Sequence, residues 1–122
     1  MQFHKIFSAA ALISLTAACS FNNSLSEINA LNEANPTGSA FSATLAEEYR
    51  VFSNFQLEQE EDFTDAIHFA RKGLAAANGV NAMPEPISDW DLSQRQILEL
   101  YDGRARLIAA YDAGAIEYFP KL

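Results

Sequence analysis

Hydrophobic residues recur at helical spacing in three stretches that follow residue 38. The first begins at Ser39, and its apolar positions lie three or four residues apart, as on one side of an amphipathic helix. These positions are Phe41, Leu45, Tyr49, Phe52 and Phe55. Glu47, Glu48 and Arg50 fall outside this stripe, so the pattern predicts that the aromatic side is buried and the charged side is exposed.

The second stretch carries a helix signal at each end. Asp62 and Asp65 place negative charge at its start, where the helix dipole favours it, and Asn78 with Gly79 supplies a stop. Its apolar positions are Phe63, Ile67, Ala70, Leu74 and Ala77. The two stretches together predict a helical hairpin.

A third helix is expected after a loop that contains Pro84 and Pro86, since proline interrupts a helix. This helix should begin near Asp91 or Ser93 and share one core with the hairpin. Its apolar positions are Ile97, Leu100, Tyr101, Ile108, Tyr111 and Ala115. No stretch alternates as a strand would, so the sequence predicts an all-α fold, a helical hairpin plus a third helix.

Residues 19–38 are rich in asparagine and serine, a composition typical of a polar tether. Within them Ser24 and Glu27 match a capping box and predict a short helix, which Pro36 would end. The apolar side of that helix would hold Leu25, Ile28 and Leu31.

The first 18 residues have the features of a secretory signal peptide. Lys5 is their only charged residue, and an apolar stretch then runs from Ile6 to small side chains at Ala17 and Ala18. As a helix this stretch would span about 20 Å, whereas a bilayer core is about 30 Å thick. A cleaved signal is therefore expected rather than a transmembrane helix.

The leader ends at residues 15–19, a leucine, a threonine, two alanines and Cys19. This run resembles the lipobox of bacterial lipoproteins. The resemblance implies that the thiol of Cys19 receives a diacylglycerol and that the acylated residue anchors the chain in a lipid bilayer. Ser20 stands where aspartate retains such proteins in the inner membrane, so the resemblance implies the outer membrane, facing the periplasm. The alternative is an ordinary secretory signal beside an unmodified cysteine.

The chain is acidic, with 16 Asp and Glu against 8 Lys and Arg, one of which is Lys5 in the leader. Such a surface repels nucleic-acid phosphates, so no nucleic-acid partner is expected. Cys19 is the only cysteine, which excludes an internal disulfide.

Candidate chemistry in the helical part is sparse. His68 follows Asp65 by three residues, but zinc needs three or four ligands, and a solvated helix histidine is the simpler interpretation. Asp89, Asp91 and Ser93 resemble the start of a calcium loop whose later ligands are missing, and are expected to cap the third helix. We therefore expect no enzyme, no catalytic residue, no metal site and no cofactor. An enzyme built from carboxylates is the alternative.

Three aromatic residues are candidate interface positions. Tryptophan is favoured at binding hot spots, so Trp90 could anchor a partner, although a lone tryptophan beside a helix start more often pins its loop to the core. Tyr118 and Phe119 lie near the end of the sequence with no later segment to cover them. Pro120 can begin a helix, so we expect the natural chain to continue beyond Leu122.

Two further resemblances concern the helical part. Residues 62–74 are similar to the second helix of a tetratricopeptide unit. Segments 36–41, 69–77 and 103–115 follow, in order, the N-terminal helical region of OmpA-family lipoproteins of alphaproteobacteria. In that family a C-terminal OmpA-like domain binds peptidoglycan. The resemblance implies a peptidoglycan contact through such a domain, which these residues do not include.

The sequence therefore predicts a lipoprotein signal peptide over 1–18, a lipidated cysteine and tether over 19–38, and an α-helical module over 39–122. The expected function is an outer-membrane-anchored spacer or docking surface in the cell envelope, within an OmpA-like peptidoglycan-associated protein. The alternative is a stand-alone tetratricopeptide-like adaptor that binds another periplasmic protein. The sequence does not identify that partner.

Overall fold

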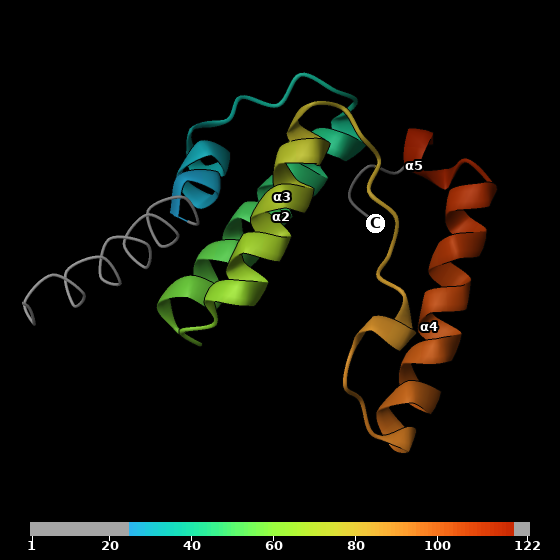
Figure 1. Ribbon diagram of the computed structural model, residues 1–122. Helices are drawn as coiled ribbons and strands as arrows, with labels where there is room; N and C mark the ends of the chain where they lie inside the picture. The colour runs from blue at the N-terminus through green and yellow to red at the C-terminus, as the bar shows by residue number, and fades with distance from the viewer. Residues whose placement is uncertain (1–24, 119–122) are drawn as a thin grey trace, which may run out of the picture.

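The computed structural model describes residues 25–118. In chain order it contains a helix over 25–33, α2 (Ala40–Glu58), α3 (Phe63–Ala77), the short 3-10 helix η1 (Ile87–Asp89), α4 (Gln94–Asp112) and α5 (Ala115–Tyr118). No strand occurs among these residues, and the all-α prediction is confirmed for them (Figure 1).

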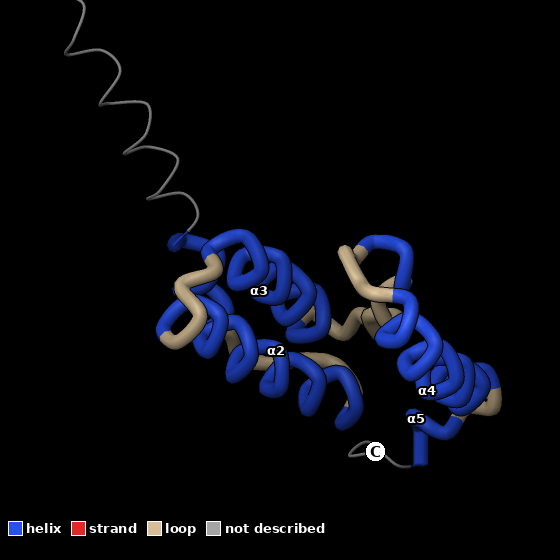
Figure 2. Tube along the Cα trace, turned by 90° about the horizontal axis from the view of Figure 1, so that it is seen from below, coloured by secondary structure: helices blue, strands red, loops and turns tan. Residues whose placement is uncertain are grey.

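Helices α2 and α3 lie side by side as an antiparallel hairpin (Figures 1 and 2). Each begins near the predicted position, at a polar cap: the Ser39 side chain accepts a hydrogen bond from the Ser42 amide at 3.1 Å, and Asp62 accepts one from the Asp65 amide at 3.0 Å. After α3 the chain turns at Gly79, whose φ of +87° is a left-handed value that glycine adopts without a steric penalty.

The seam between α2 and α3 is built from small side chains. Helix α2 contributes Ser42, Ala46 and Ser53, and α3 contributes a matching set of small residues. That set is Ala66, Ala70, Gly73, Ala76 and Ala77, and the one large residue of α3 that is buried with them is Phe69. Small residues let the two backbones approach closely, and the hydroxyl of Ser53 donates a 2.7 Å hydrogen bond to the Ala66 carbonyl across the seam.

The aromatic stripe of α2 therefore borders the core instead of forming it. The sequence pattern predicted burial, but Phe52 is 41% and Phe55 45% exposed, and Phe63 at the start of α3 is 43% exposed. The prediction was wrong by about one helical position, because the small residues of α2 face α3 and the rings beside them fall outside the seam. They lie along its edge, where Tyr49 is half-buried.

The helix over 25–33 packs on the hairpin, so this part of the segment expected to be a tether belongs to the folded body. Ile28 and Leu31 are 2% and 0% exposed. Arg50 donates hydrogen bonds to the carbonyls of Leu31 and Ala34 at 3.1 and 3.0 Å, which satisfies acceptors at the end of this helix. The predicted short helix is confirmed, and it supplies the two largest fully buried side chains of the core.

Helix α4 begins at the capping box of Ser93 and Gln96, one of the two predicted starts. It ends at Asp112, because Gly114 adopts a φ of +73° and the chain turns before α5. The expectation that the third helix continues to Ala115 was therefore wrong. Gly114 is the stop signal that the sequence pattern had passed over.

Helix α4 does not share the core of the hairpin and has no buried residue. Leu100 and Tyr101 were expected inside but are 50% and 69% exposed, while Ile97 and Ile108 are half-buried. The reason is the long connection of residues 78–93, which carries α4 away from α3 (Figures 1 and 2).

Side chains of α4 attach it to that connection. Arg104 donates hydrogen bonds to the carbonyls of Glu85 and Pro84 at 2.6 and 3.3 Å. The hydroxyl of Tyr111 donates one to the Ala82 carbonyl at 3.1 Å. The ring of Tyr111 also meets Phe41 of α2 edge to face, with centroids 5.5 Å apart. These contacts fix one side of α4 and leave the other open.

Candidate docking surface

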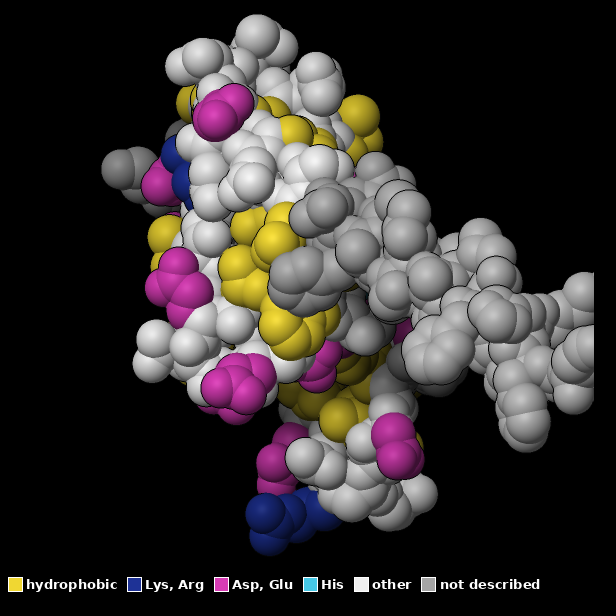
Figure 3. Space-filling model, turned by 60° about the vertical axis from the view of Figure 1, so that its left-hand side comes forward, with side chains coloured by type: hydrophobic (Ala, Val, Ile, Leu, Met, Phe, Trp, Pro, Cys, Tyr) yellow, Lys and Arg dark blue, Asp and Glu magenta, His cyan; other side chains and the backbone are white. Residues whose placement is uncertain are grey.

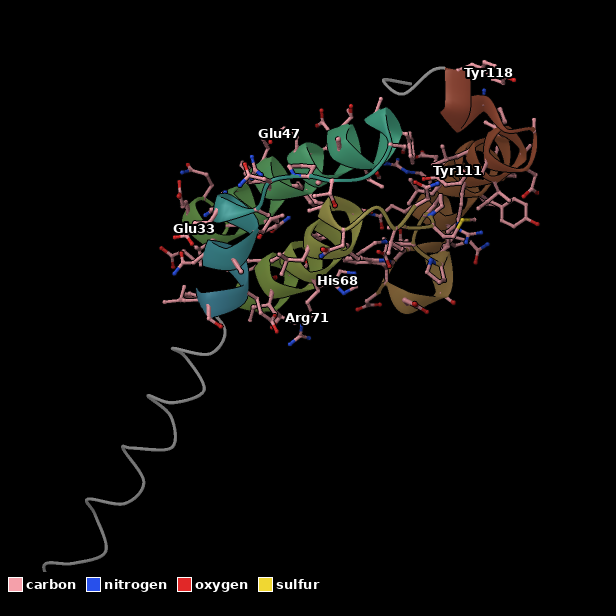
Figure 4. The ribbon with its side chains drawn as sticks, turned by 90° about the horizontal axis from the view of Figure 1, so that it is seen from above. Glu33, Glu47, His68, Arg71, Tyr111 and Tyr118 are labelled. Carbon is pink, nitrogen blue, oxygen red and sulfur yellow. The ribbon has the colours of Figure 1, made fainter. Side chains whose placement is uncertain are left out.

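The four residues singled out from the sequence do not form one site. Cys19 and Phe119 lie outside the described residues. Tyr118 is 75% exposed in α5, at the far end of the body from the helix over 25–33 (Figure 4). Trp90 lies beside α3. The candidate interface positions are therefore separate features of the molecule.

Trp90 follows η1 and packs on the hairpin. Its ring stacks on Phe69 of α3 with centroids 6.0 Å apart and an interplanar angle of 13°, and His68 meets it edge to face at 6.1 Å. Phe69 also contacts Phe52 and Tyr49, at 4.6 and 6.0 Å. This aromatic cluster pins the crossing loop to the hairpin, which is the second of the two roles considered for Trp90.

Beside the aromatic cluster, one carboxylate of the loop bridges two residues of α3. Glu85 pairs with Lys72 and lies 3.2 Å from the Nε2 atom of His68, whose side chain points toward the loop (Figure 4). Lys72 also donates a 3.1 Å hydrogen bond to the Met83 carbonyl, and its ammonium lies 5.4 Å from the centre of the Tyr49 ring. The loop is thus fastened by charge as well as by stacking.

The environment of this pair favours its charged form. Burial alone would lower the pKa of Lys72, but hydrogen bonds to Glu85 and Tyr49 outweigh it and raise that pKa above 10.5. Burial would raise the pKa of Glu85, but hydrogen bonds from Lys72 and then His68 bring it below 4.5. Both groups are partly exposed, so the pair contributes about 1 kcal/mol or less. The pair stabilises the fold between pH 4.5 and pH 10.5, where both groups are charged.

The other polar candidates have local roles. His68 pairs with Glu85 rather than with Asp65, and within residues 25–118 no three side chains are grouped as metal ligands. Of the three residues that resembled a calcium loop, Ser93 caps α4 and Asp89 lies in η1, where its carboxylate accepts a 3.2 Å hydrogen bond from Ser88.

Two helices each present three or more large apolar side chains to solvent. On α4 these are Leu98, Leu100, Tyr101 and Leu107, which are 47–69% exposed. On α2 they are Val51, Phe52 and Phe55, which are 41–61% exposed. On α4, Leu98 and Tyr101 lie on one side of the helix and Leu100 and Leu107 on the other. Uncovered apolar side chains that are neighbours on a helix are typical of an interaction surface. Figure 3 shows one face of the protein, on which apolar side chains lie open among acidic ones.

Several of these residues were not among the candidates from the sequence. Lys72 and Glu85 are 13 residues apart and come together only because the loop folds back. Val51 was not a candidate because the apolar stripe predicted for α2 was defined by aromatic positions. The spacing from Glu48 through Val51 and Phe55 to Glu58 was a signal that could have revealed it.

Comparison of the chain with protein-family models, with curated proteins and with solved structures gave no match. None of the helices within residues 25–118 is both long and apolar enough to cross a bilayer.

Proposed function

We propose that this protein is a lipid-anchored docking module of the bacterial cell envelope. Acylated Cys19 would hold it to the outer membrane, with the helical body in the periplasm. The lipobox-like run at residues 15–19 supports the anchor. In a longer protein of the family that the sequence resembles, the body would lie between the membrane and a domain that binds peptidoglycan.

One observation supports docking over a purely passive spacer. The body has a packed core, yet large apolar side chains are uncovered on both α2 and α4. Leu98 and Tyr101, one turn apart on α4, are 66% and 69% exposed. A spacer has no need of such a surface, and keeping it in water costs about 25 cal/mol for each Å².

The anchor is tested by Cys19→Ala in a Gram-negative host fed radioactive palmitate. The parent should incorporate label into a membrane-bound form, and the variant should remain as unlabelled precursor. Equal incorporation by both proteins would refute the anchor.

Docking is tested in the same cells by photo-crosslinking from single positions. A crosslinker at Val51 or Leu98 should give discrete adducts. The same group at Arg95 of α4 or Arg71 of α3, whose side chains are 86% and 67% exposed and polar, should give few. Adducts of equal yield at the apolar and the polar positions would show that neither surface binds anything specifically.

A further inference from the structure

The strongest feature beyond the anchor is the apolar stripe of α2, formed by Val51, Phe52 and Phe55. Phe55 lies four positions after Val51 and three after Phe52, so its side chain is a neighbour of both on the helix surface. They are 61%, 41% and 45% exposed. The stripe is therefore a continuous apolar surface along about one turn of α2.

The rest of α2 shows that this side has no cover within residues 25–118. One side forms the seam with α3 through Ser42, Ala46 and Ser53. A second side meets the helix over 25–33, through Arg50 and a pair of hydrogen bonds between Asn32 and Asn54. The stripe lies on the third side, where Phe52 contacts the ring of Phe69 in α3.

Carboxylates bracket the stripe. Glu48 precedes Val51 by three residues, and Glu58 follows Phe55 by three, so each lies about one turn beyond an end of the apolar surface. Both are exposed, and among the described residues neither has a cation within ion-pair distance. Ten residues of helix separate them, about 15 Å at 1.5 Å per residue.

Every cation of residues 25–118 is already engaged within the chain. Each of the six lysine and arginine side chains bonds to a carboxylate or a backbone carbonyl: Arg50, Arg71, Lys72, Arg95, Arg104 and Arg106. The charges left without a partner are carboxylates. The body therefore offers an incoming molecule apolar contact and negative charge.

This charge distribution decides between occupants. A second copy of the chain would bring the same carboxylates against Glu48 and Glu58, and juxtaposed like charges oppose association. Anionic lipid headgroups would be repelled for the same reason. A helix with an apolar side and a lysine or arginine beyond each end of it satisfies both features of the surface.

We infer that the stripe of Val51, Phe52 and Phe55 docks a cationic amphipathic helix of another protein, with basic residues about 15 Å apart that pair with Glu48 and Glu58. This inference rests on the proposed docking function and names the chemistry of the partner. The apolar contact supplies most of the affinity, and the two carboxylates set the orientation and select against acidic helices.

The probe is a synthetic helix of leucine, alanine and lysine whose lysines lie one turn beyond each end of a leucine stripe. A peptide with glutamate in place of lysine is its control. Binding to the full chain in uncharged maltoside micelles is measured by fluorescence anisotropy at several salt concentrations. Adsorption to the micelle is the same for every variant and cancels in the comparison.

Two double variants separate the electrostatic contribution to binding from the apolar one. The pair Glu48→Gln and Glu58→Gln should weaken binding of the lysine peptide about fivefold and flatten its salt dependence. The pair Val51→Ser and Phe55→Ser should weaken binding roughly tenfold or more. Phe52 is left unchanged because its ring packs against Phe69 of α3. Helix content by circular dichroism verifies that each variant is folded.

Matched controls lie away from both apolar surfaces: Val80→Ser removes an apolar side chain of the loop that is 53% exposed, and Asp112→Asn removes an unpaired carboxylate of α4. Neither should alter binding. Equal binding of the lysine and glutamate peptides, an unchanged affinity in the glutamine variant, or a loss caused by Val80→Ser would each overturn the inference. Absence of peptide binding while cellular crosslinks persist would overturn it and leave the docking function standing. Absence of both would end the docking function itself.

Discussion

Replacing Gly73 by alanine should destabilise this protein, yet stabilise a form of it in which Leu31 is also alanine. Gly73 lies in α3 beneath Leu31, which is fully buried. A Cβ atom at position 73 would lie 2.6 and 2.8 Å from the two δ carbons of Leu31 and 3.0 Å from the Cβ of Tyr49. The first two distances are shorter than any normal contact, so the fully buried Leu31 side chain, or the helix that carries it, would have to move.

The magnitudes follow from two opposing effects. Alanine is favoured over glycine inside a helix by about 1 kcal/mol, while an extra methyl group forced into a packed core costs about 1–3 kcal/mol. Gly73→Ala alone should therefore lower the free energy of unfolding by up to about 2 kcal/mol. Leu31→Ala alone should lower it by about 2–5 kcal/mol. With Leu31 truncated, the main clash disappears and Gly73→Ala should restore up to about 1 kcal/mol.

The double-mutant cycle is measured by urea unfolding followed by far-ultraviolet circular dichroism, with all four proteins in the same detergent. We expect a coupling free energy of about 1–3 kcal/mol, set by the clash. Gly103→Ala is the control, because nothing lies within 4 Å of the Cβ it would add. If Gly73→Ala changes the free energy of unfolding equally in both backgrounds, within about 0.5 kcal/mol, the close packing of Leu31 on Gly73 is refuted.

Three further predictions address the loop, a turn and the surface. The lowered pKa of Glu85 means that its bonds persist above pH 4.5 and weaken as pH falls below it, so Trp90 emission should shift to the red in acid. Glu85→Gln should show the shifted emission at neutral pH with no further acid dependence. Gly79→Ala should cost about 1–2 kcal/mol in urea unfolding, since its φ is +87°, and an unchanged midpoint would contradict this. Leu98→Ala should stay within about 0.5 kcal/mol of the parent, whereas Ile28→Ala should cost about 2–5 kcal/mol; equal effects would show that the exposed and buried positions were misassigned.

Helix boundaries were predictable from the sequence because caps are local. Ser39, Asp62 and Ser93 bond to amides three residues ahead, so each start depends on a few adjacent residues. The stop at Gly79 is equally local. Gly114 carries the same kind of signal, and it was overlooked because the apolar spacing continues past it.

The identity of the buried side was less predictable. Apolar periodicity locates a helix and its apolar half, but the separation between two helices decides which part of that half is enclosed. In α2 the small side chains of Ser42 and Ala46 allow close approach, and the rings beside them are left at the edge. Whether a serine or the neighbouring phenylalanine is buried depends on how the two helices fit together. The apolar spacing of one helix alone does not contain that information.

The candidate site depended on contacts between distant residues. Glu85 reaches Lys72 and His68 only after the loop has crossed α3, and Trp90 then stacks on Phe69. Nothing in the residues around Glu85 specifies that path. The stripe of α2 could have been found by following carboxylate spacing as well as aromatic spacing.

Attachment of α4 through backbone carbonyls has a consequence for how the protein can vary. Arg104 and Tyr111 bond to the main chain at residues 82, 84 and 85, not to side chains there. The side chain at position 82 could therefore change without loosening α4, whereas inserting or deleting one residue between 80 and 86 would move every acceptor out of register. Relatives of this protein should conserve the length of that loop more strictly than its composition. Transfer of α4 to another protein would require the loop to be transferred with it, because the loop's backbone supplies the acceptors.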